Sequence, residues 1–129
     1  NEGSDCGDPL SLQVIRSTYD YTFETPFGIN GADNLLDPTT SCVASRGSPE
    51  SAAFGITNHY ANGFLDLPSE EIARVVNARD NVRERIRACH EAFGRLLNLV
   101  LVDFWSVGEV IDIIQEFNAD LPPTREGTL

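Results

Sequence analysis

The chain has 129 residues and a hydrophobic content of 41 %, enough for one folded domain with a core, so general disorder is excluded. Its formal net charge is −11, and all nine basic residues are arginines. Because no basic stripe is present, we expect no nucleic-acid partner. We interpret the acidic excess as a solvated surface, since net charge governs solubility rather than fold.

The sequence shows no targeting signal and no membrane-spanning segment. Residues 1–9 are polar and acidic, which is not the pattern of a signal peptide. The longest apolar stretch, Leu99–Val102, is far too short to cross a bilayer. The three cysteines, Cys6, Cys42 and Cys89, lack the spacing of metal ligands. We therefore expect no metal site, and no cofactor is evident.

The first half of the chain predicts two strands separated by a long loop. Residues 12–24 are rich in β-branched and aromatic side chains with a period of two, which is typical of a strand, and Pro26 ends it. Residues 27–51 are rich in Gly, Asn, Asp, Ser and Pro and predict a long loop of the kind that is functional or tied down. Residues 52–58 form a short apolar run that predicts a buried strand.

The second half predicts helices around one further strand. Pro68 stands at a first helical position, and Asp80 is expected to cap a second helix that Gly94 ends. Residues 96–105 are almost continuously apolar and predict a central parallel strand that is covered on both faces. Residues 106–109 read as a capping box, Ser-x-x-Glu, for the last helix.

Alternation of strands and helices predicts an α/β fold with parallel strands. The strands near residues 12–24, 52–58 and 96–105 should lie side by side with helices on one side, because such crossovers are right-handed. We assign residues 1–118 to one domain and residues 119–129 to a polar tail. A complete barrel of eight strand–helix units needs roughly 250 residues, so this chain has about half of one.

Four short pieces stand out in order along the chain. They are Tyr21–Phe27 (YTFETPF), Cys42 with Arg46–Gly47, Ile56–Tyr60 (ITNHY), and Asn98–Trp105 (NLVLVDFW) with Gly108–Val110 and Phe117–Asn118. Their order and spacing resemble the phospholipase C-like phosphodiesterases, the family of bacterial phosphatidylinositol-specific phospholipase C and its eukaryotic X-domain relatives. The resemblance implies a partial TIM (β/α) barrel that contains the last three parallel strands, the sixth to the eighth, with their helices.

The resemblance implies that the protein is a phosphoric diester hydrolase of the phospholipase C-like type. In this chemistry a neighbouring hydroxyl of the substrate attacks phosphorus, a histidine base and acid move the protons, and an arginine or metal bears the phosphate charge. The expected partner is a phospholipid or other phosphodiester substrate, inositol phospholipids being the best-known ones of the family. Calcium stays open for the complete enzyme, because animal relatives use it and secreted bacterial ones do not.

The two histidines of the chain do not match the catalytic motifs of this family. Those histidines lie in its N-terminal half, one of them in a His-Asn motif, whereas His59 and His90 stand elsewhere. We therefore expect a fragment that lacks the catalytic histidines, needs the missing N-terminal half of the barrel, and is inactive alone. The alternative is a non-catalytic binding or interaction module derived from this barrel.

Asp103 is the sharpest catalytic candidate, because it follows an apolar strand at the end where barrel enzymes place catalytic groups. The resemblance implies that it hydrogen-bonds the histidine base, and the alternative is a cap for the next helix. Glu24 and Arg46 are candidates for binding a substrate hydroxyl and a phosphate. Their alternatives are a partly solvated carboxylate and a loop-bracing salt bridge. The resemblance implies that Asn58 and His59 line the substrate site at the next strand end, and the alternative for His59 is a structural role.

Cys42 and Cys89 resemble a pair of cysteines that recurs at these places in eukaryotic-type relatives, which implies a disulfide between them. Cys6 is left without an assigned partner. A disulfide belongs to an oxidising compartment. We therefore expect the protein to be extracellular or to pass through the secretory pathway.

Overall fold

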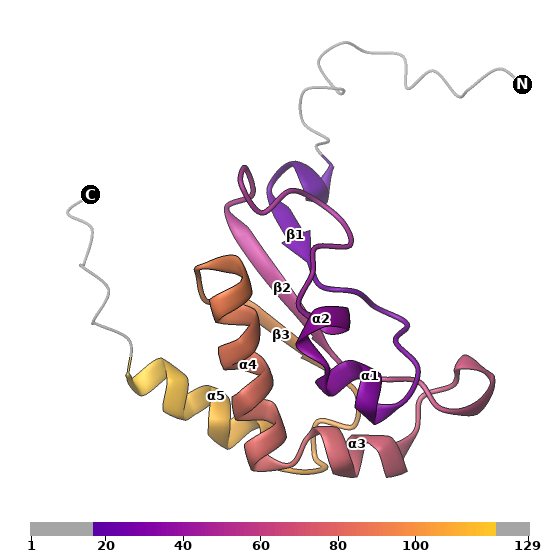
Figure 1. Ribbon diagram of the computed structural model, residues 1–129. Helices are drawn as coiled ribbons and strands as arrows, with labels where there is room; N and C mark the ends of the chain where they lie inside the picture. Colours follow the sequence, from indigo (N-terminus) through magenta and orange to yellow (C-terminus); the bar gives the residue numbers. More distant parts are fainter. Residues whose placement is uncertain (1–16, 121–129) are drawn as a thin grey trace, which may run out of the picture.

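Three short parallel strands form the centre of the computed structural model, which describes residues 17–120 (Figure 1). The strands are β1 (Thr22–Glu24), β2 (Phe54–His59) and β3 (Leu99–Val102), in that order across the sheet. Both pairings are parallel. The predicted α/β fold with three parallel strands side by side is confirmed, with shorter strands than the sequence indicated.

Most helices lie between the strands along the chain, while η1 precedes β1 and α5 follows β3. The helices are the 3-10 turns η1 (Thr18–Asp20) and η2 (Phe64–Asp66) and the α-helices α1 (Ala32–Leu36), α2 (Pro38–Ser41), α3 (Glu70–Val76), α4 (Arg79–Phe93) and α5 (Val110–Ala119). Helices α4 and α5 lie together on one side of the sheet, and α2 contacts α4 (Figure 1). None of the helices within residues 17–120 has the length and apolar character needed to cross a membrane.

The main core lies between the sheet and helices α4 and α5. Val100 and Val102 of β3 pack against four buried aliphatic residues of these helices, namely Val82, Ile86, Val110 and Ile113. Burial of one such side chain contributes ~1.5–3 kcal/mol. This contact holds the helical layer on one face of the sheet.

The opposite face of the sheet is open within the described residues. Phe54 and Leu99 are each 52 % exposed, and Leu101 is 46 % exposed. Side chains alternate along a strand, so Leu99 and Leu101 point away from the core that contains Val100 and Val102. The prediction that β3 is a central strand covered on both faces therefore does not hold within residues 17–120, where β3 lies at the edge of the sheet and only its helical face is covered.

The register of the strands gathers their carboxyl ends at one edge. Glu24 lies opposite Ile56, and His59 lies opposite Val102. The backbone N–H of Glu24 also donates to the carbonyl of Arg46 at 2.9 Å, so the loop before β2 pairs with the end of β1. Residues from three separate parts of the chain thus meet at this edge.

The predicted strand over residues 12–24 is too long at its start. Its residues 12–16 lie outside the described part of the chain, and residues 18–20 form the turn η1. The Ser17 hydroxyl accepts the Tyr19 N–H at 3.3 Å and starts this turn. Such local side-chain bonds compete with strand pairing, and this competition explains the difference.

The predicted loop over residues 27–51 contains the short helices α1 and α2, which the composition did not indicate. Asp37 caps α2 by accepting the Thr39 N–H at 2.9 Å, and Pro38 occupies the first helical position. A capping residue and a proline at the first position are therefore sufficient to start a helix here, although the helix has only four residues.

Two predicted helix starts shift by a few positions. Helix α3 begins at Glu70 rather than Pro68, because the Ser69 hydroxyl accepts the Ile72 N–H at 3.4 Å and so makes Ser69 the cap. Helix α4 begins at Arg79, so Asp80 lies in its first turn, where its charge favours the helix dipole, instead of capping it.

The predicted capping box at residues 106–109 is not formed. Helix α5 has Glu109 as its N-cap residue, without a side-chain hydrogen bond, and Ser106 lies in the preceding turn. The end of α4 agrees with prediction, because Gly94 has a left-handed φ of 64°. Glycine tolerates this conformation at a helix end without a steric cost.

Cys42 and Cys89 form a disulfide that ties the end of α2 to α4. Their sulfur atoms are 2.00 Å apart and their Cα atoms 4.8 Å apart. Both residues are buried. The bond agrees with the pairing that the family resemblance implied, and it anchors the segment that leads to Arg46.

We expect the double variant Cys42→Ala, Cys89→Ala to be less stable by about 2–4 kcal/mol, because the bond restricts the unfolded chain across a long loop. The two cysteines are 47 residues apart in sequence. Urea unfolding of wild type and variant under non-reducing conditions measures the difference. Wild type with reductant should match the variant, and equal midpoints for oxidised wild type and variant would contradict the expectation.

Candidate functional site

A polar cluster lies where the strands end, and Glu24 is at its centre. This last residue of β1 is only 5 % exposed. One carboxylate oxygen accepts from the guanidinium of Arg46 and from the Tyr19 hydroxyl at 3.2 Å, and the other accepts from the Asn58 amide at 3.3 Å. A buried carboxylate is costly unless it is paired, and these three donors meet that need.

Asn58 connects the ends of β1 and β2. Its side-chain amide donates to the carbonyl of Thr25 at 2.7 Å as well as to Glu24, and its backbone N–H donates to the Thr25 hydroxyl at 2.9 Å. Both Asn58 and Thr25 are buried. The amide is therefore fixed in orientation and holds the Glu24 carboxylate on the side of the sheet opposite to the helices.

Arg46 brings a positive charge from the loop before β2. Its guanidinium carbon lies 4.1 Å from the ring centre of Phe27 and 5.0 Å from that of Tyr19, which are cation–π distances. Its Nε bonds to Glu24, while its two terminal nitrogens have no acceptor within residues 17–120. The side chain is 43 % exposed. The loop-bracing salt bridge is thus present, and the outer part of the guanidinium faces solvent.

Gly47 allows the loop to approach β1 this closely. Its φ is 73°, and an added Cβ would collide with the backbone of Thr22. A side chain at this position would therefore push the neighbouring Arg46 away from Glu24.

Asp103 directly follows β3. Because side chains alternate along a strand, Asp103 continues the row of Leu99 and Leu101 on the open face of the sheet. Within residues 17–120 its carboxylate accepts no hydrogen bond, while its backbone carbonyl accepts from the Asn77 amide at 3.2 Å. The carboxylate is therefore available to a further donor.

Tyr60 follows β2 near these charged groups and was missed by the sequence analysis. Burial raises the pKa of Tyr60, the negative charges of Asp103 and Glu24 raise it further, and the charge of Arg46 lowers it. The charges of Asp103, Glu24 and Arg46 therefore all influence the Tyr60 hydroxyl. The one signal in the sequence is its position two residues after Asn58, because residues two apart on a strand share a face.

Asn77 fixes the loop that carries Asp103. Its side-chain amide donates to the carbonyls of Asp103 and Val107 at 3.2 and 3.1 Å, and its own carbonyl accepts the Glu109 N–H at 2.9 Å. Gly108, with φ 84°, passes so close to Asn77 that an added Cβ would collide with it. Asn77 is 1 % exposed, and its Oδ1 is without a partner among the described residues.

His59 points to the helical side and not into this cluster. Its Nε2 is 2.9 Å from the Val76 carbonyl, and its Nδ1 is 3.4 Å from the guanidinium of Arg85. A carbonyl only accepts, so Nε2 carries the proton and Nδ1 accepts from Arg85. This position of His59 differs from the expected one in the substrate site. Asn58 points to the open face of the sheet, so the next residue, His59, must point to the helical face.

Burial lowers the pKa of His59 to about 4, and the charge of Arg85 lowers it too, while the bond to the Val76 carbonyl opposes the shift. The imidazole is therefore neutral at neutral pH. It has no exposure to solvent. Both properties argue against a role for His59 as a catalytic base.

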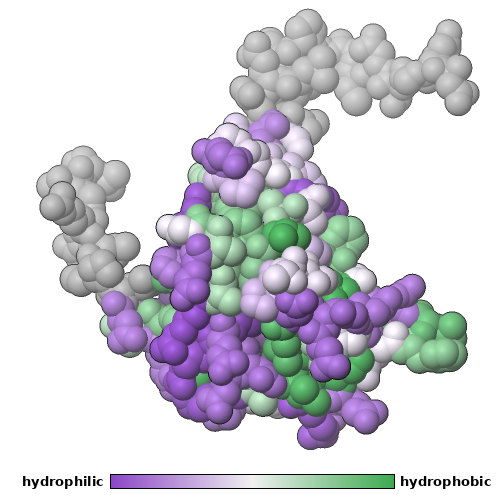
Figure 2. All heavy atoms as spheres, in the orientation of Figure 1, coloured by the Kyte–Doolittle hydropathy of each residue, from purple (hydrophilic) through white to green (hydrophobic). Residues whose placement is uncertain are grey.

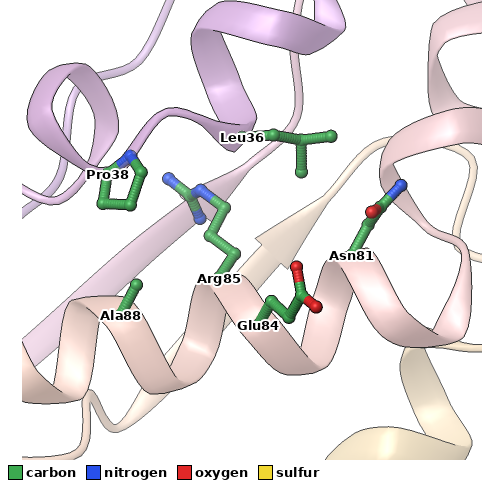
Figure 3. Close-up of a pocket in the computed structure, with 6 residues that line it drawn as sticks. All are labelled: Leu36, Pro38, Asn81, Glu84, Arg85 and Ala88. Atoms are coloured by element: carbon green, nitrogen blue, oxygen red, sulfur yellow. The ribbon is translucent and has the colours of Figure 1, made fainter.

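Arg85 is a buried cation without a carboxylate partner among residues 17–120. It extends from α4 toward the segment between Leu36 and Pro38, where it borders a cavity of about 240 Å³ (Figure 3). Its Nε donates to the Leu35 carbonyl at 3.0 Å, and its Nη2 donates to the Ser41 carbonyl at 3.3 Å. Burial lowers its pKa to about 10, so the group stays charged. The carbonyls near the ends of α1 and α2 offset this charge.

The other histidine, His90, is exposed on α4. Neither histidine of the chain therefore contacts the cluster around Glu24. Within residues 17–120 no three His, Cys, Asp or Glu side chains gather in a way that could hold a metal ion.

Residues 6–118 match the family model described as PI-PLC X 1. The chain belongs to the PI-PLC X family. This confirms the family that the four short pieces indicated. No curated protein and no solved structure matches the chain. The PI-PLC X match covers every member of the cluster, from Tyr19 to Asn58, and also Asp103.

We expect the stability of the PI-PLC X chain to fall as the pH decreases from about 6.5 to about 4, because His59 must stay neutral when folded. Its pKa is 6.5 when unperturbed and about 4 in the fold, so the unfolded state binds more protons across this window. The loss should reach about 3 kcal/mol. Urea unfolding at several pH values measures it.

The matched controls are His59→Gln and His90→Gln. The first removes the titrating group and should flatten the pH dependence in this window, whatever its effect on absolute stability. The second changes an exposed histidine and should leave the pH dependence of the stability as in wild type. A His59→Gln variant that keeps the wild-type slope would show that another group is responsible.

Proposed function

We propose that this PI-PLC X chain forms the C-terminal part of a phospholipase C-like phosphodiesterase site. The observation that carries the proposal is the cluster of Glu24, Arg46 and Asn58 at the C-terminal edge of a parallel sheet. Barrel enzymes build their sites at this edge. The three strands would be the sixth to eighth of a TIM barrel, and the remaining strands would cover Phe54 and Leu101.

Arg46 would bear part of the phosphate charge. Its orientation is fixed in advance by Glu24 and by the rings of Tyr19 and Phe27, which lowers the entropic cost of binding. Its terminal nitrogens face solvent and match the geometry of a phosphate oxygen pair. Glu24 and Asn58 would then position a substrate hydroxyl beside the phosphate.

Asp103 would orient a histidine general base and stabilise its charged form. The base would take the proton from a substrate hydroxyl that attacks phosphorus. The bond from phosphorus to the leaving alcohol would then break, and a second histidine would protonate the leaving oxygen. Since His59 and His90 lie away from the cluster, both catalytic histidines would come from outside residues 17–120. The chain alone would then be inactive.

The substrate class in this proposal is a phospholipid or another phosphodiester, with inositol phospholipids as the first to test. Calcium use stays open for the complete enzyme, and a set of three or more His, Cys, Asp or Glu ligands would have to include residues outside 17–120. The buried Cys42–Cys89 disulfide supports a protein of the secretory pathway or the extracellular space.

In the complete protein we expect Asp103→Asn to lower turnover of a phosphodiester substrate by about 10³–10⁴-fold, because the amide keeps the shape but loses the charge that steadies a protonated histidine. The measurement is kcat with phosphatidylinositol and a panel of other phospholipids. Asp112→Asn, an exposed change in the first turn of α5, should be close to wild type. Near-normal turnover of Asp103→Asn in a folded protein would refute the role.

A second prediction concerns Arg46 and needs no turnover. We expect inorganic phosphate to shift the backbone NMR signals around Glu24 and Asn58 in the full chain, and Arg46→Gln to weaken this binding roughly tenfold or more, because a charge-assisted bond is lost. Arg87→Gln on α4 is the exposed control. Equal phosphate affinity in wild type and Arg46→Gln would limit Arg46 to bracing the loop.

The second candidate function is a non-catalytic binding module. It is favoured by the placement of both histidines away from the cluster. In this case phosphate would still bind through Arg46, but the complete protein would hydrolyse none of the phospholipids, and Asp103→Asn would leave binding unchanged. Turnover by the complete protein separates the two candidates.

A further inference from the structure

A cavity of about 240 Å³ lies in the helical layer, between α4 and the junction of α1 and α2. It is lined by Leu36, Pro38, Asn81, Glu84, Arg85 and Ala88, none of which belongs to the cluster around Glu24. Cavities that bind drug-sized molecules measure about 300–1,000 Å³, so a ligand of this one must be small. Figure 2 shows a mainly hydrophilic surface along α4, which favours a polar ligand.

The positive charge of Arg85 has no counter-charge within residues 17–120. Its side chain is buried, and the residue is 3 % exposed. The more exposed arginines Arg74, Arg79 and Arg83 each pair with a glutamate. A buried charge is costly unless an opposite charge meets it. The carbonyl dipoles around Arg85 offset its charge without neutralising it, so an anion that enters the cavity would stabilise the fold.

The guanidinium of Arg85 also has hydrogen-bond donors left over. It carries a pair of N–H groups on each terminal nitrogen. Within residues 17–120, Nη1 bonds to His59 and Nη2 to the Ser41 carbonyl, while Nε serves the Leu35 carbonyl and the Ser41 hydroxyl. One N–H of each terminal nitrogen therefore has no acceptor among these residues. Such charged donors bind carboxylate oxygens strongly.

The other polar groups of the cavity favour a cation. Figure 3 shows the guanidinium of Arg85 on the side of Pro38 and the carboxylate of Glu84 on the side of Asn81. Glu84 is exposed and takes part in none of the ion pairs within residues 17–120. The Asn81 amide donates to the Val75 carbonyl at 2.8 Å, which leaves its Oδ1 as an acceptor. A carboxylate and an amide oxygen suit an ammonium group. They disfavour phosphate, because Glu84 would repel its multiple negative charge.

We propose that this cavity binds a small amino acid, whose carboxylate bonds to Arg85 and whose ammonium group bonds to Glu84. The proposal goes beyond the phosphodiesterase function, because the cavity lies on the helical side of the sheet and contains no residue of that site. The ligand would join α4 to the junction of α1 and α2, so it would stabilise the helical layer.

The test is an NMR titration of the full chain at neutral pH with glycine, β-alanine and γ-aminobutyrate, which differ in the distance between their two charges. Acetate and methylammonium supply each charge separately. We expect one of the amino acids to bind roughly tenfold or more tightly than either half, because it makes both charged contacts. His59 has no exposure to solvent and lies beside Arg85, so its imidazole signals should shift on binding in the cavity and not on surface binding.

Three variants separate the contacts. Ala88→Leu fills the cavity and keeps every charge, so it should abolish binding. Glu84→Gln removes the partner of the ammonium group and should weaken binding roughly tenfold. Arg85→Gln should lose the carboxylate contact, and thermal unfolding checks that it folds; the first two variants decide the test if it does not. Glu91→Gln is the matched control, an exposed glutamate of α4 outside the cavity, and should bind like wild type.

Three results would overturn the proposal. The first is the absence of a shift in the His59 signals with every amino acid tested. The second is equal affinity of wild type and Ala88→Leu. The third is acetate binding as tight as that of the amino acids, which would mean an adventitious ion only. Turnover of phosphodiesters by the complete protein is a separate measurement. Its absence would refute the proposed hydrolase and leave amino-acid binding intact, because the two sites share no residue.

Discussion

The arrangement of this protein depends on the central position of β2, which pairs in parallel with both other strands. Because side chains alternate along a strand, neighbouring residues at its end enter opposite layers. Asn58 joins the cluster around Glu24, while His59 enters the helical layer and meets Arg85. This alternation separates two polar networks that are adjacent in the sequence, and it leaves the open face with acid, amide and arginine groups but without a histidine.

The two networks solve the problem of buried charge in different ways. On the open face, Glu24 is neutralised by Arg46, whose outer nitrogens still face solvent and can meet an anion. In the helical layer, Arg85 has no carboxylate partner among the described residues and is met by backbone carbonyls near the ends of α1 and α2. The first network is suited to binding, because its charge is accessible. The second holds the helices and the disulfide Cys42–Cys89 in place, and it borders the cavity at Arg85.

The edge at which the strands end carries the features that bear on function. Asn77 braces the loop after β3 and so positions Asp103, and the loop after β2 carries Tyr60 and then the exposed Phe64 and Leu65. Parallel strands bring these loops together because all of their carboxyl ends lie at one edge. The proposed phosphodiesterase site rests on this geometric fact, whereas the PI-PLC X assignment rests on the family-model match over residues 6–118.

Three parallel strands, the family, the end of α4 at Gly94 and, through the resemblance, the cysteine pairing could all be predicted from the sequence. Periodicity, glycine conformation and motif order are local properties, so they can be read without a structure. Only the three-dimensional structure shows which face of the sheet each side chain of β2 takes. The apolar run over residues 52–58 has no alternating polar residues, so its sequence does not indicate which side chains point to which face. The structure also decided the burial of Arg85, whose partner Leu35 is 50 residues away in the chain. A helical stripe shows where a side chain points, but only folding shows which distant carbonyls it meets there.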